Sequence, residues 1–134
     1  MSEKREINEK YREMAQAIIE QDDALVNIRN SKAKIAYLSS DLAKTDKGRI
    51  VYGQCEKVAD KYKWGIDADF MITLFDPNLE GKSDAIIERV LFHELLHVGV
   101  EFAPDGGERY SVTPHDLEDF KECIDRWGTS WVEE

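Results

Sequence analysis

The chain has 134 residues, of which 42% are hydrophobic and 34% charged, and its formal net charge is −10. This size and composition predict one globular domain over residues 1–134 with a buried core. The negative charge argues against binding to nucleic acid or to anionic membranes, because phosphate contacts need a basic surface. The N-terminus has no apolar signal segment and no stretch reaches the ~18 apolar residues of a membrane span, so we expect a cytoplasmic protein.

The N-terminal region predicts a helix. Ile7, Tyr11, Met14 and Ile18 recur at helical spacing, which indicates an amphipathic helix over residues 3–20 that packs through this stripe. Residues 21–34 are polar and extend the helical region after a break.

The middle of the chain predicts short strands. Residues 34–39 read as a strand, 41–48 as a charged loop, and 49–53 as a strand followed by a strand extension or a helical turn. Residues 68–75 (ADFMITLF) give the clearest strand, and the turn residues Asp-Pro-Asn end it. Both faces of this strand are apolar, so we expect it inside the sheet.

Residues 93–97 read His-Glu-Leu-Leu-His. Two histidines four residues apart on a helix lie one turn apart on the same face, so both imidazoles can reach one metal ion. Glu94 lies about 100° around the helix from His93, where its carboxylate can act on a water without binding the metal. The pattern predicts a catalytic zinc site, with His93 and His97 as ligands and Glu94 as general base.

The surrounding residues predict a buried helix for this motif. Ser83 is a good N-cap, residues 85–98 contain neither Gly nor Pro, and Gly99 stands where a helix often ends. Apolar residues occupy most sides of the helix, which is typical of a core element.

A catalytic zinc site usually has three protein ligands, and His115 is the third and last histidine of the chain. Thr113-Pro114 predicts the start of a C-terminal helix that ends near Trp127, with His115 in its first turn. His115 is the preferred third ligand. The alternatives are Asp116, Glu118, Asp119 and Glu108.

The segment between the motif and His115 reads as an exposed loop over residues 101–109. Tyr110 follows it and is a candidate donor to a transition-state oxyanion, although a packing tyrosine is the more common interpretation. Strands joined without crossover helices indicate an α+β class with an antiparallel or mixed sheet, packed on the N-terminal helix and the motif helix. Cys55 and Cys123 are too few for a disulfide scaffold and read as free thiols, with a cysteine ligand as a minor alternative.

Four segments together resemble a known family. GRIVYGQCEKVADKYKW, DFMITLF, LFHELLHVG and TPHDLEDF are similar to the pattern of the putative phage metallopeptidase family, and the layout resembles SprT-like and minimal gluzincin domains. The resemblance implies a zincin-like fold, zinc on His93, His97 and His115, Glu94 as base, and a phage or prophage origin. No zinc-ribbon cysteines follow the domain, unlike in some SprT-like proteins.

These observations predict a zinc peptidase that acts on a protein or peptide substrate, with substrate identity and oligomeric state left open. An extended substrate would add as a strand along residues 68–75. One alternative is a noncatalytic module that zinc stabilises, and zinc bound to Cys55 or Cys123 would favour it. Another is a zinc hydrolase acting on RNA, which the net charge of −10 and the presence of Glu94 disfavour.

Overall fold

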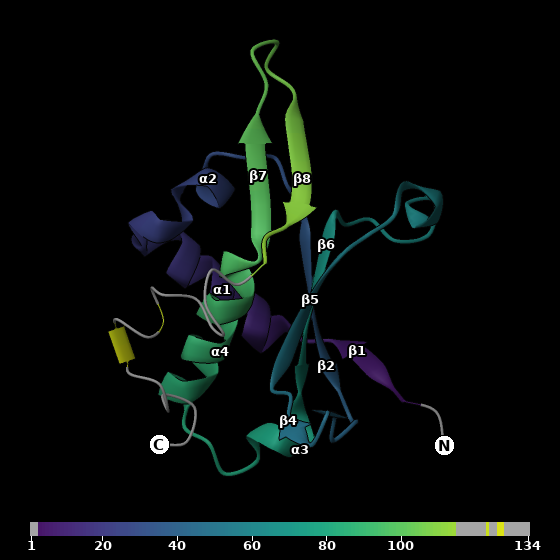
Figure 1. The fold of residues 1–134 in the computed structure, drawn as a ribbon, viewed down its shortest axis with the longest axis vertical. Helices are drawn as coiled ribbons and strands as arrows, with labels where there is room; N and C mark the ends of the chain where they lie inside the picture. Colours follow the sequence, from purple (N-terminus) through teal and green to yellow (C-terminus); the bar gives the residue numbers. More distant parts are fainter. Residues whose placement is uncertain (1–2, 115–122, 124–125, 128–134) are drawn as a thin grey trace.

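The structure, a computed structural model, describes residues 3–114, 123, 126 and 127. It has a mixed α+β fold (Figure 1), as predicted. The strands are β1 (Arg5–Ile7), β2 (Ile35–Ser40), β3 (Thr45–Asp46), β4 (Arg49–Ile50), β5 (Gly53–Lys57), β6 (Phe70–Phe75), β7 (Val98–Phe102) and β8 (Glu108–Val112). The α-helices are α1 (Glu9–Gln21), α2 (Val26–Arg29), α3 (Asp76–Leu79) and α4 (Asp84–Leu96), and the short 3-10 helices are η1 (Asp23–Leu25) and η2 (Asp60–Tyr62).

The main sheet has four strands in the order β1-β2-β6-β5. β1 pairs antiparallel with β2 and β5 pairs antiparallel with β6, but β2 and β6 are parallel. The sheet is therefore mixed, and a purely antiparallel arrangement is wrong. The cause is the placement of β5, which follows β2 in sequence but lies on the far side of β6.

Strand β6 is the buried centre of this sheet. Five of its six residues are buried, which confirms the prediction from its two apolar faces. Its hydrogen-bonding edges are both occupied, by β2 on one side and β5 on the other. A substrate strand cannot add to β6, so the expectation that residues 68–75 bind an extended substrate is wrong.

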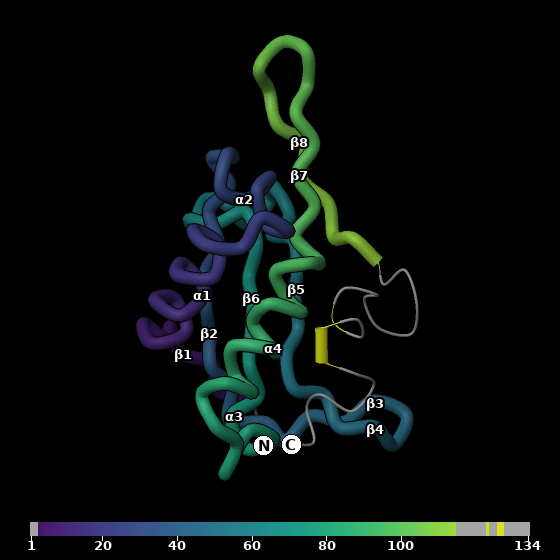
Figure 2. Tube along the Cα trace, turned by 90° about the vertical axis from the view of Figure 1, so that its left-hand side faces the viewer, coloured from purple at the N-terminus to yellow at the C-terminus, as the bar shows by residue number. Residues whose placement is uncertain are grey.

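Helices α1 and α4 lie on the same side of the main sheet (Figures 1 and 2). They pack on each other and on the strands, and the core forms between them and the sheet. Its fully buried large side chains include Phe70, Ile72, Leu74, Leu91, Phe92 and Leu95.

The N-terminal helix begins later than predicted. Residues 5–7 form β1, and Ile7 is 74% exposed instead of packing in the helix stripe. Asn8 has extended backbone, and its side chain accepts a hydrogen bond from the Tyr11 amide at 3.0 Å, which caps α1. An N-cap residue of this kind starts a helix, and the apolar spacing at Ile7 could not reveal it. η1 and α2 continue the helical region after the break, as expected.

Two predicted loops contain hairpins. Residues 45–50 form the small β3–β4 hairpin, whose base is fixed by Asn78: its side-chain amide donates to the carbonyls of Lys44 (2.9 Å) and Val51 (2.7 Å). Much of the predicted loop at 101–109 belongs to the β7–β8 hairpin, which projects from the body of the molecule (Figure 1). After β4, the chain takes the predicted strand extension as β5.

Three residues of the C-terminal region are described, and all three have helical backbone. They are Cys123, Arg126 and Trp127. The predicted start of the C-terminal helix beyond Pro114 lies outside the described residues. Among the helices that the described residues form, none has the length and apolar content to cross a membrane.

Candidate metal site

Helix α4 carries the histidine motif. Its N-cap is Ser83, as predicted, and the serine hydroxyl accepts from the Ile86 amide at 3.4 Å. Apolar side chains on most of its sides are buried, so the helix is a rigid central element. The motif therefore lies at the end of a helix that the core holds in place.

The helix ends within the motif. His93 is in its last turn, and His97 is the C-cap with φ −75° and ψ −19°. Their ring centroids lie 5.3 Å apart with an interplanar angle of 68°. The two imidazoles are side by side, as the spacing of four residues predicts, and are close enough to share one ion.

His97 is held by the residue that follows β8. Thr113 donates its amide to the His97 carbonyl at 2.6 Å, and the Thr113 carbonyl lies 2.6 Å from His97 Nδ1. A carbonyl oxygen only accepts, so Nδ1 carries a proton, and in the neutral ring the lone pair is then on Nε2. A backbone carbonyl on one ring nitrogen is a common way to orient a metal-binding histidine.

Gly99 allows this approach of β8. The prediction that Gly99 ends the helix is wrong. Gly99 is the second residue of β7, because the chain passes from His97 directly into the hairpin. A Cβ atom at Gly99 would lie 2.8 Å from the Ser111 carbonyl oxygen and 2.8 Å from Thr113 Oγ1. A side chain at this position of β7 would collide with Ser111 and Thr113, so only glycine fits here.

Glu94 is buried, with 5% of its surface exposed. Its side chain lies against β5, where a Cβ at Gly53 would be 3.1 Å from both Cγ and Oε2 of Glu94. Cys55, also on β5, is half-buried, and its burial together with the charges of Glu94 and Glu56 raises the pKa of its thiol to about 12.

The third ligand lies outside what the structure describes. His115 and its alternatives Asp116, Glu118 and Asp119 all fall on residues that are not described. Within the described part of the chain, no three His, Cys, Asp or Glu side chains form a group that could hold a metal ion.

The remaining alternative, Glu108, has other partners. Its carboxylate accepts the backbone amide of Lys32 at 2.9 Å and the hydroxyl of Tyr110 at 2.7 Å. The Tyr110 ring packs edge-on against Phe70, with centroids 5.6 Å apart, and burial raises the pKa of its hydroxyl to about 12. These contacts favour a packing role for Tyr110 over the oxyanion role.

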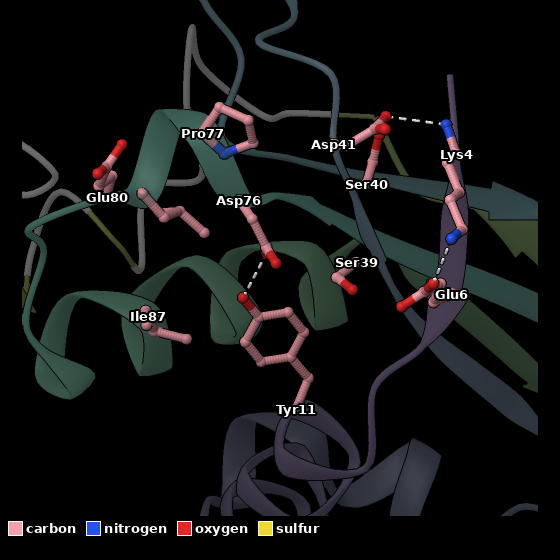
Figure 3. A pocket seen from close by; sticks show the side chains of 11 residues that line it. Lys4, Glu6, Tyr11, Ser39, Ser40, Asp41, Asp76, Pro77, Glu80 and Ile87 are labelled. Atoms are coloured by element: carbon pink, nitrogen blue, oxygen red, sulfur yellow. Dashed lines mark hydrogen bonds and ion pairs between the residues drawn. The ribbon is translucent and has the colours of Figure 1, made fainter. Parts of the chain in front are cut away.

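The hollow in Figure 3 is a separate feature. It encloses about 510 Å³, and among its lining residues are none of the three motif residues His93, Glu94 and His97. The Tyr11 hydroxyl donates to Asp76 at 2.6 Å across it, and burial together with this bond raises the pKa of Tyr11. We assign the hollow no part in the metal chemistry.

Two contacts of the motif residues have no signal in the sequence. They are the Thr113 carbonyl at His97 and the close approach of Gly53 to Glu94. Cys123, which the sequence offers as a minor alternative ligand, is fully buried with Sγ 3.9 Å from His93 Nδ1. Each contact depends on how distant segments pack, so a linear motif could not reveal them.

The donor set fits zinc. Two neighbouring imidazoles, one with Nε2 as its lone-pair nitrogen, are typical zinc ligands, and a buried carboxylate beside them suits a base. A family model described as "putative phage metallopeptidase" matches residues 3–134. No curated protein matches the chain, and no solved structure matches it either.

Proposed function

From the membership of this chain in the putative phage metallopeptidase family, we propose that it is a zinc-dependent enzyme that hydrolyses peptide bonds. In this proposal His93, His97 and His115 hold one zinc ion per chain, and Glu94 is the general base. The observation that carries it is the pair of imidazoles with ring centroids 5.3 Å apart on a helix end that also presents a buried carboxylate.

The chemistry that zinc supplies when bound is Lewis acidity toward a water and toward the scissile carbonyl. Glu94 accepts a proton from the attacking water and transfers it to the leaving amine. Burial favours this role, because water competes less for the carboxylate in a low-dielectric environment. Thr113 contributes by holding the ring of His97 in one orientation.

An extended substrate would bind along β5. This strand is terminal in the main sheet, so within the described residues only one of its edges is paired, with β6. Gly53 at its beginning lies against Glu94, so a peptide that adds to the outer edge of β5 would pass beside the base. This proposal replaces β6 with β5 as the substrate-binding strand.

Metal content measured by elemental analysis tests the ligands. We expect about one zinc per chain in the wild type and in Glu94→Gln, and loss of zinc in His93→Ala and His115→Ala. Loss in Asp116→Ala with retention in His115→Ala would move the third ligand to Asp116. No zinc in the reconstituted wild type would refute the proposal.

Cleavage of a fluorogenic protein substrate such as labelled casein tests the base. Glu94→Gln should keep its zinc and lose activity by about 10²–10⁴-fold, the range expected for a general base. A Glu94→Gln variant that cleaves as fast as the wild type would show that the carboxylate is not the base.

A noncatalytic zinc-stabilised module remains the rival function. Structural zinc sites are closed by four protein ligands, and cysteine is frequent among them. Cys123 contacts His93, so whether it binds the metal distinguishes the two functions.

A further inference from the structure

Cys123 contacts His93, one of the two histidines of the motif. Its Sγ atom lies 3.9 Å from Nδ1 of His93, and its side chain is fully buried. The contact reaches the same ring nitrogen that the Thr113 carbonyl engages on His97. Both imidazoles therefore meet a protein group at Nδ1.

Two residues close to Cys123 in sequence also contact the protein near His93. One is Trp127, which packs edge-on against Phe92 with ring centroids 5.4 Å apart. Cys123 and Trp127 therefore both contact α4. The residues that they contact are adjacent on α4: Trp127 packs on Phe92, and Cys123 contacts His93.

Arg126, the neighbour of Trp127 in sequence, also contacts the body of the protein. Its guanidinium lies 4.5 Å from the centre of the Phe92 ring and forms an ion pair with Asp22 at 2.6 Å. The contacts of Arg126 and Trp127 thus hold the chain near Cys123 against α4 and Asp22.

The contact reaches Nδ1 of His93, so a metal bound at Nε2 would lie at the other nitrogen of the ring. If His93 binds zinc through Nε2, its Nδ1 carries a proton that can be donated to sulfur. Cys123 then lies behind His93 and not beside it as a ligand.

We propose that Cys123 is a positioning residue, which orients the His93 imidazole for zinc by accepting its Nδ1–H. This inference rests on the proposed function. It pairs each motif histidine with one orienting partner: a backbone carbonyl for His97 and a buried thiol for His93. Partners of this kind usually change metal affinity by about 10–100-fold when removed.

The test compares zinc dissociation constants, measured by competition with a chromophoric chelator, for the wild type and three variants. Cys123→Val keeps the apolar volume but cannot accept the bond, Cys123→Ala removes the group, and Cys123→Ser offers a hydroxyl acceptor. We expect about tenfold weaker zinc binding in the Val and Ala variants and partial recovery in the Ser variant. Cys55→Ala, which removes the other thiol, should bind zinc as tightly as the wild type.

The cobalt-substituted protein provides a readout that is independent of turnover. A thiolate bound to cobalt gives an intense charge-transfer band in the near ultraviolet, and the wild type should lack it. A band that disappears in Cys123→Ala would overturn the inference by making Cys123 a ligand, and would favour the noncatalytic module. Wild-type zinc affinity in Cys123→Val, with only its unfolding midpoint changed, would overturn it in favour of a packing role.

The two proposals fail in different ways. A wild type that binds zinc while all Cys123 variants bind it equally well refutes the positioning role and leaves the peptidase intact. A wild type that binds no zinc refutes both.

Discussion

Gly99→Ala should weaken both the fold and the metal site. The new Cβ would lie 2.6 Å from Ser111 Oγ, which can rotate away, but also 2.8 Å from the Ser111 carbonyl oxygen, which cannot. Strand β8 must therefore move by about 0.5 Å to restore ordinary contact distances. Thr113 follows two residues later and would move with it.

The expected magnitude combines two opposing effects. Overpacking costs about 1–3 kcal/mol, while alanine stabilises a strand by roughly 0.5–1 kcal/mol relative to glycine. We expect a net destabilisation of about 1–2 kcal/mol, or a melting temperature lower by about 3–10 °C. Zinc affinity should fall about tenfold, because the displaced Thr113 carbonyl orients His97 less well.

Urea unfolding of the zinc-free protein and chelator competition measure the two effects separately. Gly65→Ala is the matched control, because a Cβ there has no neighbour within 4 Å. If Gly99→Ala unfolds at the wild-type urea concentration and binds zinc with wild-type affinity, the close approach of β8 does not constrain His97.

Three further changes test other parts of the structure. Gly53→Ala should lower kcat about tenfold at unchanged zinc content, because its Cβ would displace Glu94, and unchanged turnover would contradict the placement of the base. Asn78→Ala should lower the free energy of unfolding in urea by about 1–2 kcal/mol, because two carbonyls at the base of the β3–β4 hairpin lose their donor. An unchanged urea midpoint would show that these two hydrogen bonds do not stabilise the hairpin. The ion pair with Arg126 holds the pKa of Asp22 below its ordinary value, so its stabilisation is present above about pH 4 and is lost as pH falls through the lower folded-state pKa. The free energy of unfolding of the wild type should therefore exceed that of Asp22→Asn by about 0.5–1 kcal/mol near pH 7, and the two should be equal near pH 2. Thermal unfolding at both pH values measures the difference. A difference that does not depend on pH would exclude the charge of Asp22 as its origin.

Local patterns predicted the elements that carry their own signals. The capped α4 helix, the central apolar strand β6 and the adjacency of His93 and His97 follow from hydrophobic spacing, from Ser83 and from the helical repeat. The α+β class followed from the order of these elements.

The elements that the sequence did not predict depend on pairing between distant segments. The β1 strand forms because residues 5–7 find a partner in β2, and the β7–β8 hairpin forms because β8 returns to the end of α4. Neither partner is visible in a local window, and strand preferences depend strongly on such context. The predicted third ligand, His115, stays a prediction.

The chain passes directly from α4 into β7, so the β7–β8 hairpin is mechanically connected to the helix end that is proposed to bind the metal. Val98, the first residue of β7, directly follows His97, so no loop lies between the helix end and the strand. The five residues of β7 then extend outward over roughly 17 Å. A partner that binds the hairpin tip would therefore act at a distance on His97, the proposed zinc ligand. Linkage makes this coupling reciprocal, so zinc bound at His97 should slow hydrogen exchange of the amides in β7 and β8.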